Sequence, residues 1–165
     1  MRSVCERRAY ELGVSGACRF LGYLPASDKE ELMKACDLFC IPSRNEPFGI
    51  VVLEAWDACK PVVATEAVSI IRNFEDGLLA YIQPESLAWC INRLLSNPDE
   101  MKTLAQAGRS RIEREFRWDR IAKKTEELYI KVISNPKDMK ITRQPSFFEI
   151  LNSSTGGLHL ASTRS

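Results

Sequence analysis

Short apolar runs alternate with amphipathic patterns along most of this chain, and few folds accommodate that order. The runs predict buried strands over residues 18–21, 38–41, 61–64 and 78–82. Each run is separated from the next by a segment with the spacing of a helix. Strands that alternate with helices form a parallel sheet with helices on both faces, joined by right-handed crossovers. The sequence therefore predicts an α/β fold with a Rossmann-like, doubly wound parallel sheet.

Local signals mark the ends of the predicted helices. Ser27 and Glu30 form a capping-box pattern at the start of one helix. Asn97 and Pro98 supply an N-cap and a proline at the first position of another. A long amphipathic helix, with Trp118 on its apolar face, ends the predicted domain. The helices are expected near residues 5–12, 27–36, 49–59, 70–74, 87–94, 98–116 and 118–133.

The composition indicates one ordinary globular domain over residues 1–134. Residues 135–165 are rich in Ser, Thr and Gly without a sustained period, which predicts a disordered tail. No apolar run approaches the roughly 20 residues that span a bilayer, and the first residues lack the apolar core of a signal peptide, so we expect a cytoplasmic protein. Lys and Arg total 23 against 22 Asp and Glu, which argues against nucleic acid as a partner.

The cysteine and histidine content argues against metal sites and nucleophilic catalysis. The six cysteines lie mostly in apolar stretches and form no C-x2-C pair, so buried free thiols are expected. The only histidine, His159, lies in the polar tail, where it can complete neither a zinc site nor a Ser-His or Cys-His pair.

The loop between a predicted strand and a predicted helix, residues 43–49, holds the chemistry. Because ligands of open parallel sheets bind at the carboxyl ends of the strands, this loop is well placed. The N–H groups of Gly49, Ile50 and Val51 are expected to be free at the start of the helix, and such an end binds anions. Gly49 has no Cβ to obstruct a phosphate, so a diphosphate fits this position.

Two carboxylates flank this turn, Glu46 in the loop and Glu54 in the helix. Carboxylates accept hydrogen bonds from hydroxyl groups, so the pair suits the two sugars on either side of a diphosphate. Acidic residues near a helix start are, however, also common as caps that stabilise the helix dipole. The residues alone leave both interpretations open.

The runs FLGYLP, DLFCIPSRNEPFGIVVLEAW, KPVVAT and DGLLAYIQPESLAWCI make residues 3–133 resemble the C-terminal domain of family 4 (group 1) glycosyltransferases, which have the GT-B fold. The resemblance implies that Glu46 contacts the transferred sugar, as the catalytic residue, and that Glu54 binds the ribose. Phe48, Gly49 and Ile50 would present backbone to the sugar and diphosphate. Tyr23 and Leu24 would lie beside the base.

The resemblance further implies a retaining, metal-independent transfer from a nucleoside-diphosphate sugar, with no cofactor. It implies a separate acceptor-binding lobe as partner, upstream in the same gene or on another chain, so this chain alone is expected to be inactive. Two other interpretations remain: a non-catalytic nucleotide-sugar-binding module of a split enzyme, and a structural Rossmann-like domain whose glutamates are caps.

The resemblance implies that the first strand of the domain is missing, and four residues depart from the family pattern. Cys59 replaces the glycine that commonly ends the helix, and a cysteine tolerates a left-handed conformation poorly, at a cost of about 1 kcal/mol. Val68, Ser69 and Arg72 stand where the family has a Gly-Gly pair and a glutamate. Arg44 is the cation nearest the turn in sequence, and the simplest interpretation of it is an exposed loop residue.

Overall fold

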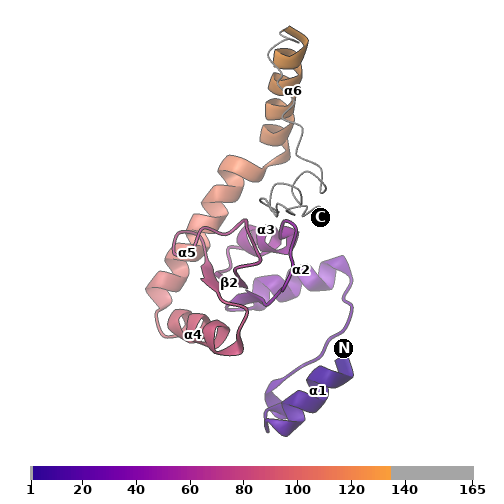
Figure 1. Cartoon of the computed structure of the whole chain (residues 1–165), viewed down its shortest axis with the longest axis vertical. Coiled ribbons are helices and arrows are strands. Elements are labelled where there is room, and N and C mark those ends of the chain that lie inside the picture. The colour runs from indigo at the N-terminus through magenta and orange to yellow at the C-terminus, as the bar shows by residue number, and fades with distance from the viewer. Residues whose placement is uncertain (1, 135–165) are drawn as a thin grey trace, which may run out of the picture. The chain divides into compact units, whose positions relative to one another are not determined.

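The computed structural model describes residues 2–134, and its elements follow the predicted alternation (Figure 1). Residues up to Ile121 form one compact unit, and the described residues from Ala122 onward continue the last helix. The predicted tail at 135–165, with His159, lies outside the described residues. Among residues 2–134, none of the helices has the length and apolar character that spanning a bilayer requires. The helices are α1 (Arg2–Glu11), η1 (Ser15–Ala17), α2 (Ala26–Ala35), α3 (Ile50–Asp57), α4 (Pro84–Leu95), α5 (Pro98–Arg111), η2 (Ile112–Phe116) and α6 (Trp118–Ser134).

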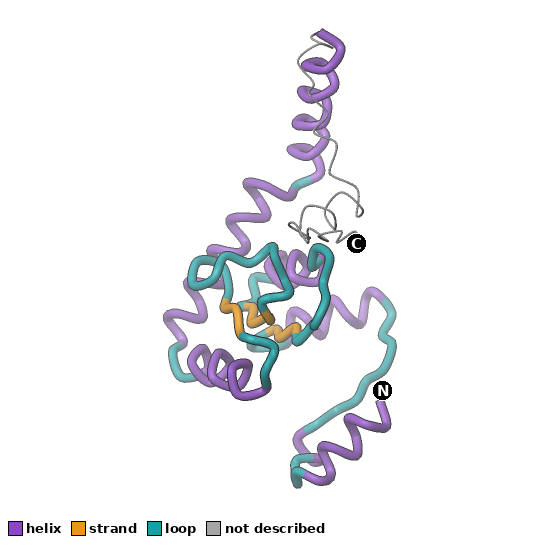
Figure 2. The backbone as a smooth tube through the Cα atoms, in the orientation of Figure 1, coloured by secondary structure: helices purple, strands orange, loops and turns teal. Residues whose placement is uncertain are grey.

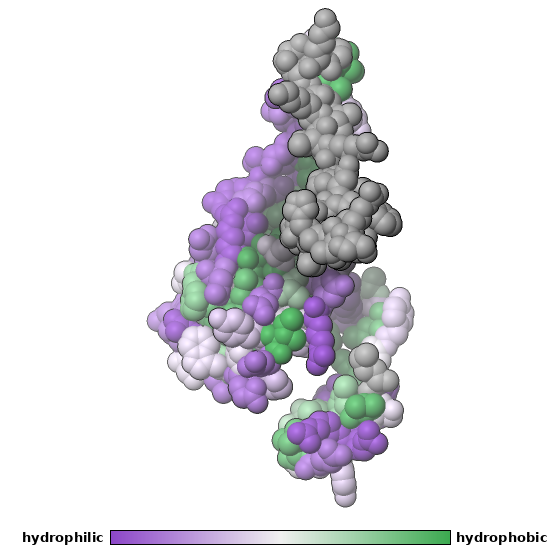
Figure 3. Space-filling view, in the orientation of Figure 1, coloured by the Kyte–Doolittle hydropathy of each residue, from purple (hydrophilic) through white to green (hydrophobic). Residues whose placement is uncertain are grey.

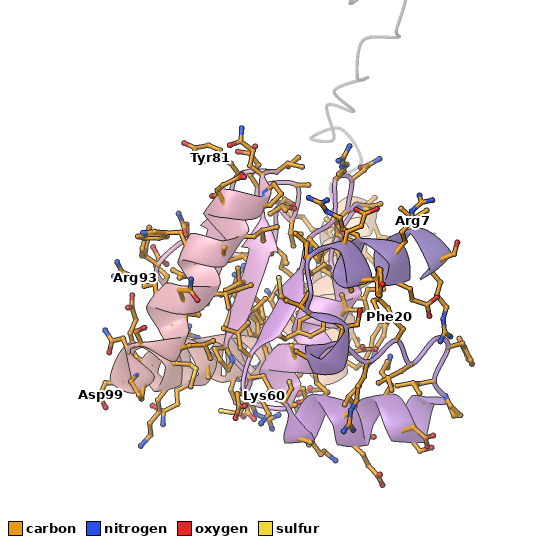
Figure 4. The ribbon with its side chains drawn as sticks, turned by 90° about the horizontal axis from the view of Figure 1, so that it is seen from below. Arg7, Phe20, Lys60, Tyr81, Arg93 and Asp99 are labelled. Atoms are coloured by element: carbon orange, nitrogen blue, oxygen red, sulfur yellow. The ribbon has the colours of Figure 1, made fainter. Side chains whose placement is uncertain are left out.

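Three short parallel strands form the sheet at the centre of the first unit (Figure 2). The strands are β1 (Phe39–Ile41), β2 (Val62–Thr65) and β3 (Leu78–Ala80), in the order β1-β2-β3. Phe39 pairs with Val62, and Val63 pairs with Leu78. Because the strands are parallel, their carboxyl ends share one edge of the sheet. Figure 4 shows Lys60, before β2, and Tyr81, after β3, at opposite ends of the sheet.

Helices cover both faces of the sheet, as the alternating side chains of β2 show. Val62 and Ala64 pack with Val52 and Trp56 of α3 on one face. Val63, between them, packs on the other face with Cys90 and Leu94 of α4. All three β2 side chains are fully buried, which is typical of a strand covered on both sides. The predicted doubly wound α/β fold is therefore confirmed.

Two predicted elements and one predicted cap are wrong. Residues 18–21 form no strand, because no other strand among residues 2–134 pairs with them. Residues 70–74 form a turn rather than a helix, since the Arg72 N–H donates to Asp76 Oδ1 at 2.8 Å and Asn73 forms a bridge with Gly77. Helix α2 begins at Ala26 with Pro25 before it, so Ser27 lies inside the helix and caps nothing.

The predicted start of α5 is confirmed in detail. Asn97 Oδ1 accepts a hydrogen bond from the Glu100 N–H at 3.3 Å, and Pro98 occupies the first helical turn. The helix continues as a π-helical turn, η2, which ends at Phe116 as expected. Hydrophilic side chains gather over the outer side of α5 and η2 in Figure 3.

A buried ion pair ties α5 to the turn that follows β2. Arg111 Nη1 donates to Asp76 Oδ2 at 2.7 Å and to the Ile70 carbonyl at 2.6 Å, with the two side chains 10% and 4% exposed. Trp56 Nε1 donates to the Asp76 carbonyl at 2.9 Å, and the Arg111 guanidinium lies 5.4 Å from the Trp56 ring centre. The hydrogen bond from Arg111 also lowers the pKa of Glu115. The stability that Glu115 contributes is thus present at neutral pH and is lost in acid.

We predict that Asp76→Asn lowers the free energy of unfolding by about 3 to 5 kcal/mol, because the buried Arg111 guanidinium then keeps only Glu115 as a charged partner. The matched control is Asp119→Asn, whose carboxylate forms an exposed pair with Arg117. That control should change stability by less than about 1 kcal/mol. Urea denaturation measures both, and equal losses in the two variants would contradict the structural role of the buried pair.

Cys59, after the end of α3, has a backbone φ of 55°, in the left-handed region that glycine occupies without strain. The left-handed backbone that makes a cysteine unfavourable at this position is therefore present in the structure. We predict that Cys59→Gly raises the free energy of unfolding by about 0.5 to 1 kcal/mol, since relief of strain exceeds the added freedom of the unfolded chain. Cys59→Ala keeps the strain and is the control. A denaturation midpoint that is unchanged or lower in the glycine variant would contradict this.

Candidate functional site

The loop that carries the candidate residues, 42–49, leaves the carboxyl end of β1 and enters α3. Two contacts hold it against the segment that follows β2. Thr65 Oγ1, fully buried, donates a hydrogen bond to the Ser43 carbonyl. Glu46 forms a parallel bridge with Val68. The loop therefore lies at the edge of the sheet where open α/β folds bind ligands.

The turn into α3 depends on Gly49. Its φ of 91° and ψ of 48° are left-handed, and a Cβ there would lie 3.1 Å from Val68 and 3.3 Å from Ile70. Both the conformation and the space therefore require glycine. Glu46 Oε1 accepts a hydrogen bond from the Gly49 N–H at 3.0 Å. The expectation that the Gly49 N–H is free is therefore wrong, because the Glu46 carboxylate caps it.

The other residues of the turn face solvent. Phe48 is 46% exposed, and its ring lies edge-on to Phe116 of η2, with ring centres 6.3 Å apart. Ile50, the first residue of α3, is 65% exposed. The N–H groups of Ile50 and Val51 belong to the first turn of the helix, where no carbonyl of an earlier turn is available to accept from them. This end of α3 can therefore receive an anion beside the Phe48 ring.

Glu54 lies further along α3 and faces α2. Its Oε1 accepts a hydrogen bond from Lys29 Nζ at 2.7 Å. Its Oε2 is a buried oxygen without a hydrogen-bond partner, and no other side chain among residues 2–134 has such an atom. An ionised oxygen in this state is costly unless a donor reaches it. A ligand that reached this oxygen would supply the hydrogen bond that it lacks.

A groove of about 330 Å³ runs between α2 and α3, and Glu54 and Lys29 both line it. Its remaining lining residues come from the same two helices: Ala26, Glu30, Met33, Lys34, Asp57 and Ala58. Volumes of this size hold small ligands. Lys29 is the functional candidate that the sequence did not reveal, because it lies 25 positions before Glu54 and only the packing of α2 on α3 joins the two charges.

The candidate residues outside the turn make no recorded contact with Glu46 or Glu54. Tyr23 is 94% exposed and Leu24 is partly buried, both in the segment before α2. No hydrogen bond or ring contact within residues 2–134 joins either of them to Glu46 or Glu54. Arg44 is exposed, as the simplest interpretation holds. No group of three metal-ligating side chains occurs among the described residues.

The segment that departs from the family pattern supports the site through packing. Val68 is fully buried and is the closest neighbour of the position where a Gly49 Cβ would lie. Ser69 is exposed beside it. Arg72 Nη2 pairs with Glu115 at 3.4 Å, so this cation is directed toward η2. In this chain the segment forms the apolar wall behind the turn.

Comparison with known proteins agrees with this geometry. Residues 1–111 match the family model described as glycosyl transferases group 1, and the chain belongs to that family. It is 35% identical over 133 residues, 78% of its length, to an uncharacterized glycosyltransferase of Methanocaldococcus jannaschii. It is 34% identical over 145 residues, 86% of its length, to a D-inositol 3-phosphate glycosyltransferase of Corynebacterium urealyticum. The chain spans 34% of each of these relatives.

Solved structures show the same fold. The Anabaena protein Alr3699/HepE, crystallised with UDP, superposes with a TM-score of 0.72 at 28% identity, over 78% of this chain and 36% of that one. The sucrose-phosphate synthase of Thermosynechococcus elongatus superposes with a TM-score of 0.70 at 29% identity, over 79% of this chain and 34% of that one. The expected membership of the glycosyltransferases, and the half of a GT-B fold, are therefore confirmed.

We predict that Gly49→Ala lowers the free energy of unfolding by at least about 1 to 2 kcal/mol, because the new methyl group meets Val68 and the backbone is left-handed. Gly16→Ala is the matched control, since a Cβ at Gly16 meets nothing within 4 Å. Thermal denaturation should show a loss for the first variant and no loss for the second. A Gly49→Ala midpoint as high as that of the parent chain would contradict the described turn.

Proposed function

We propose that this chain provides the donor site of a glycosyltransferase that uses a nucleoside-diphosphate sugar. The observation that carries the proposal is the buried, unpartnered Oε2 of Glu54, a residue that lines the groove between α2 and α3. Vicinal hydroxyl groups of a ribose would supply the donors that this oxygen lacks. The Lys29 ammonium donates a hydrogen bond to Oε1 of this carboxylate and fixes its orientation.

The turn at α3 would hold the rest of the donor. Glu46 retains its Oε2 for a hydroxyl of the transferred sugar while its Oε1 caps Gly49. The first N–H groups of α3 would face the diphosphate, beside the exposed Phe48 ring, and Ile50 would flank it. We assign Tyr23 and Leu24 to the side of the base, on the basis of the family resemblance alone.

We further propose a retaining, metal-independent transfer in which Glu46 contacts the reacting sugar and acts as the catalytic residue. Helix N–H groups, rather than a metal ion, would stabilise the diphosphate charge. The acceptor would bind on a second lobe, because this chain corresponds to about a third of its relatives' length. We expect this chain by itself to bind the donor without transferring its sugar. The Anabaena structures hold UDP and UDP-glucose, so these two compounds are the first probes.

The two glutamates should respond differently to the two ligands. Glu54→Gln should weaken UDP and UDP-glucose alike, by about 1.5 to 3 kcal/mol for a charged hydrogen bond to the ribose. Glu46→Gln should weaken UDP-glucose and leave UDP nearly unchanged, since its partner is absent from UDP. Isothermal titration calorimetry on the 165-residue chain and on both variants, with each ligand in turn, measures the six dissociation constants.

Glu31→Gln is the control, because Glu31 is an exposed residue of α2 that does not line the groove. It removes the same charge and should change neither constant. A titration with EDTA should match one without it. Equal losses for both ligands in both glutamate variants would contradict the assigned roles, and no binding by the parent chain would favour a structural domain whose glutamates are caps.

A further inference from the structure

A second pocket lies at the carboxyl end of β3, and it shares no residue with the groove at Glu54. It has a volume of about 420 Å³. The segment after β2, the turn before β3 and the first turns of α4 surround it. Its lining residues are Glu66, Asn73, Leu79, Ala80, Tyr81, Ser86, Trp89 and Cys90. Two of them are largely exposed aromatic residues, Tyr81 at 68% and Trp89 at 55%.

The Trp89 ring is restrained by contact with an ion-paired arginine. The guanidinium of Arg93 lies 5.4 Å from the ring centre of Trp89 and 5.4 Å from that of Phe74. Arg93 Nε and Nη2 in turn donate to the Glu100 carboxylate at distances of 2.9 to 3.1 Å. Figure 4 shows Tyr81 at one end of α4 and Arg93 along the outer side of that helix. A surface tryptophan fixed in this way presents a flat, preorganised apolar face.

The polar atoms of the pocket include both hydrogen-bond donors and hydrogen-bond acceptors. Asn73 Oδ1 accepts a hydrogen bond from the Leu79 N–H at 2.9 Å. The side-chain NH2 group of Asn73 therefore remains as a donor. Ser86 Oγ accepts from the Tyr81 N–H at 3.0 Å, which leaves its hydroxyl proton as a donor. Glu66 supplies an acceptor, and its own N–H is bonded to the Ala80 carbonyl at 2.9 Å. Donors and an acceptor therefore surround an aromatic face.

We propose that this pocket binds a neutral saccharide, separate from the donor site and independent of the function proposed above. A sugar ring presents C–H groups, which the negative face of an indole attracts, and hydroxyl groups that both donate and accept. An anionic ligand is disfavoured, because the one charged lining residue is Glu66 and the Arg93 charge is already met by Glu100. The occupant is a hexose unit of an oligosaccharide, stacked on Trp89 with Glu66 and Asn73 on its hydroxyl groups.

The test is NMR titration of the full 15N-labelled chain with maltoheptaose, cellohexaose and mannohexaose. At least one of these should shift the Trp89 indole N–H and the amides of Tyr81 and Ser86. Trp89→Ala should weaken the binding seen at those amides at least about tenfold. Trp118→Ala removes another exposed tryptophan and should leave binding unchanged. Glu66→Gln, which alters an exposed side chain and leaves Trp89 in place, should weaken binding about threefold or more.

Two outcomes would overturn the proposal. One is that none of the three oligosaccharides moves these signals at millimolar concentration. The other is that UDP competes with the bound saccharide, or moves the same signals in its place, since the pocket would then hold a nucleobase or belong to the donor site. Unchanged UDP affinity in Trp89→Ala, together with lost saccharide binding, is the expected pattern.

Discussion

The contact between Arg111 and Asp76 positions much of the rest of this domain. Arg111 comes from the end of α5, whereas Asp76 ends the turn between β2 and β3, and their pairing fixes that turn against Trp56 of α3. A Cβ at Gly108 would lie 2.2 Å from the Trp56 ring, so the backbone of α5 rests directly on the indole. Burial of two charges is stabilising only when their hydrogen bonds are complete, and here both partners have several.

The same turn forms the wall of the candidate site. Arg111 also holds the Ile70 carbonyl, and Ile70 and Val68 are the residues that a Gly49 Cβ would touch. A chain of contacts therefore runs from α5 through the 68–76 segment to the left-handed residue that starts α3. The turn at Glu46 is determined by packing that lies outside the motif, and the Glu46 cap then neutralises part of the positive end of the helix dipole. A bound diphosphate would share that end with the carboxylate.

The sequence predicted the elements whose signals are local and missed those that depend on distant contacts. Asn97 and Pro98 mark the start of α5 because capping involves only neighbouring residues. Residues 18–21 look like a strand, but strand formation needs a partner that the pattern does not reveal. At the site, the family motif indicated Glu46 and Glu54, whereas Lys29 could not be found, since nothing local relates a lysine of α2 to a glutamate of α3. The resemblance gave the fold that the comparisons confirm.

The order of the strands sets the relation between the Glu46 turn and the pocket at Trp89. The loop with Glu46 follows β1, whereas Tyr81 follows β3, and β2 lies between them. Neighbouring strands are about 4.8 Å apart, so these two segments leave the same edge of the sheet about 10 Å from each other. A hexose ring is about half as wide as that separation. A sugar at the Glu46 turn and a saccharide at Trp89 could therefore be bound together without overlap, and both would be approached from the carboxyl edge of the sheet. Parallel pairing alone places them on that edge, because it directs every strand's carboxyl end the same way.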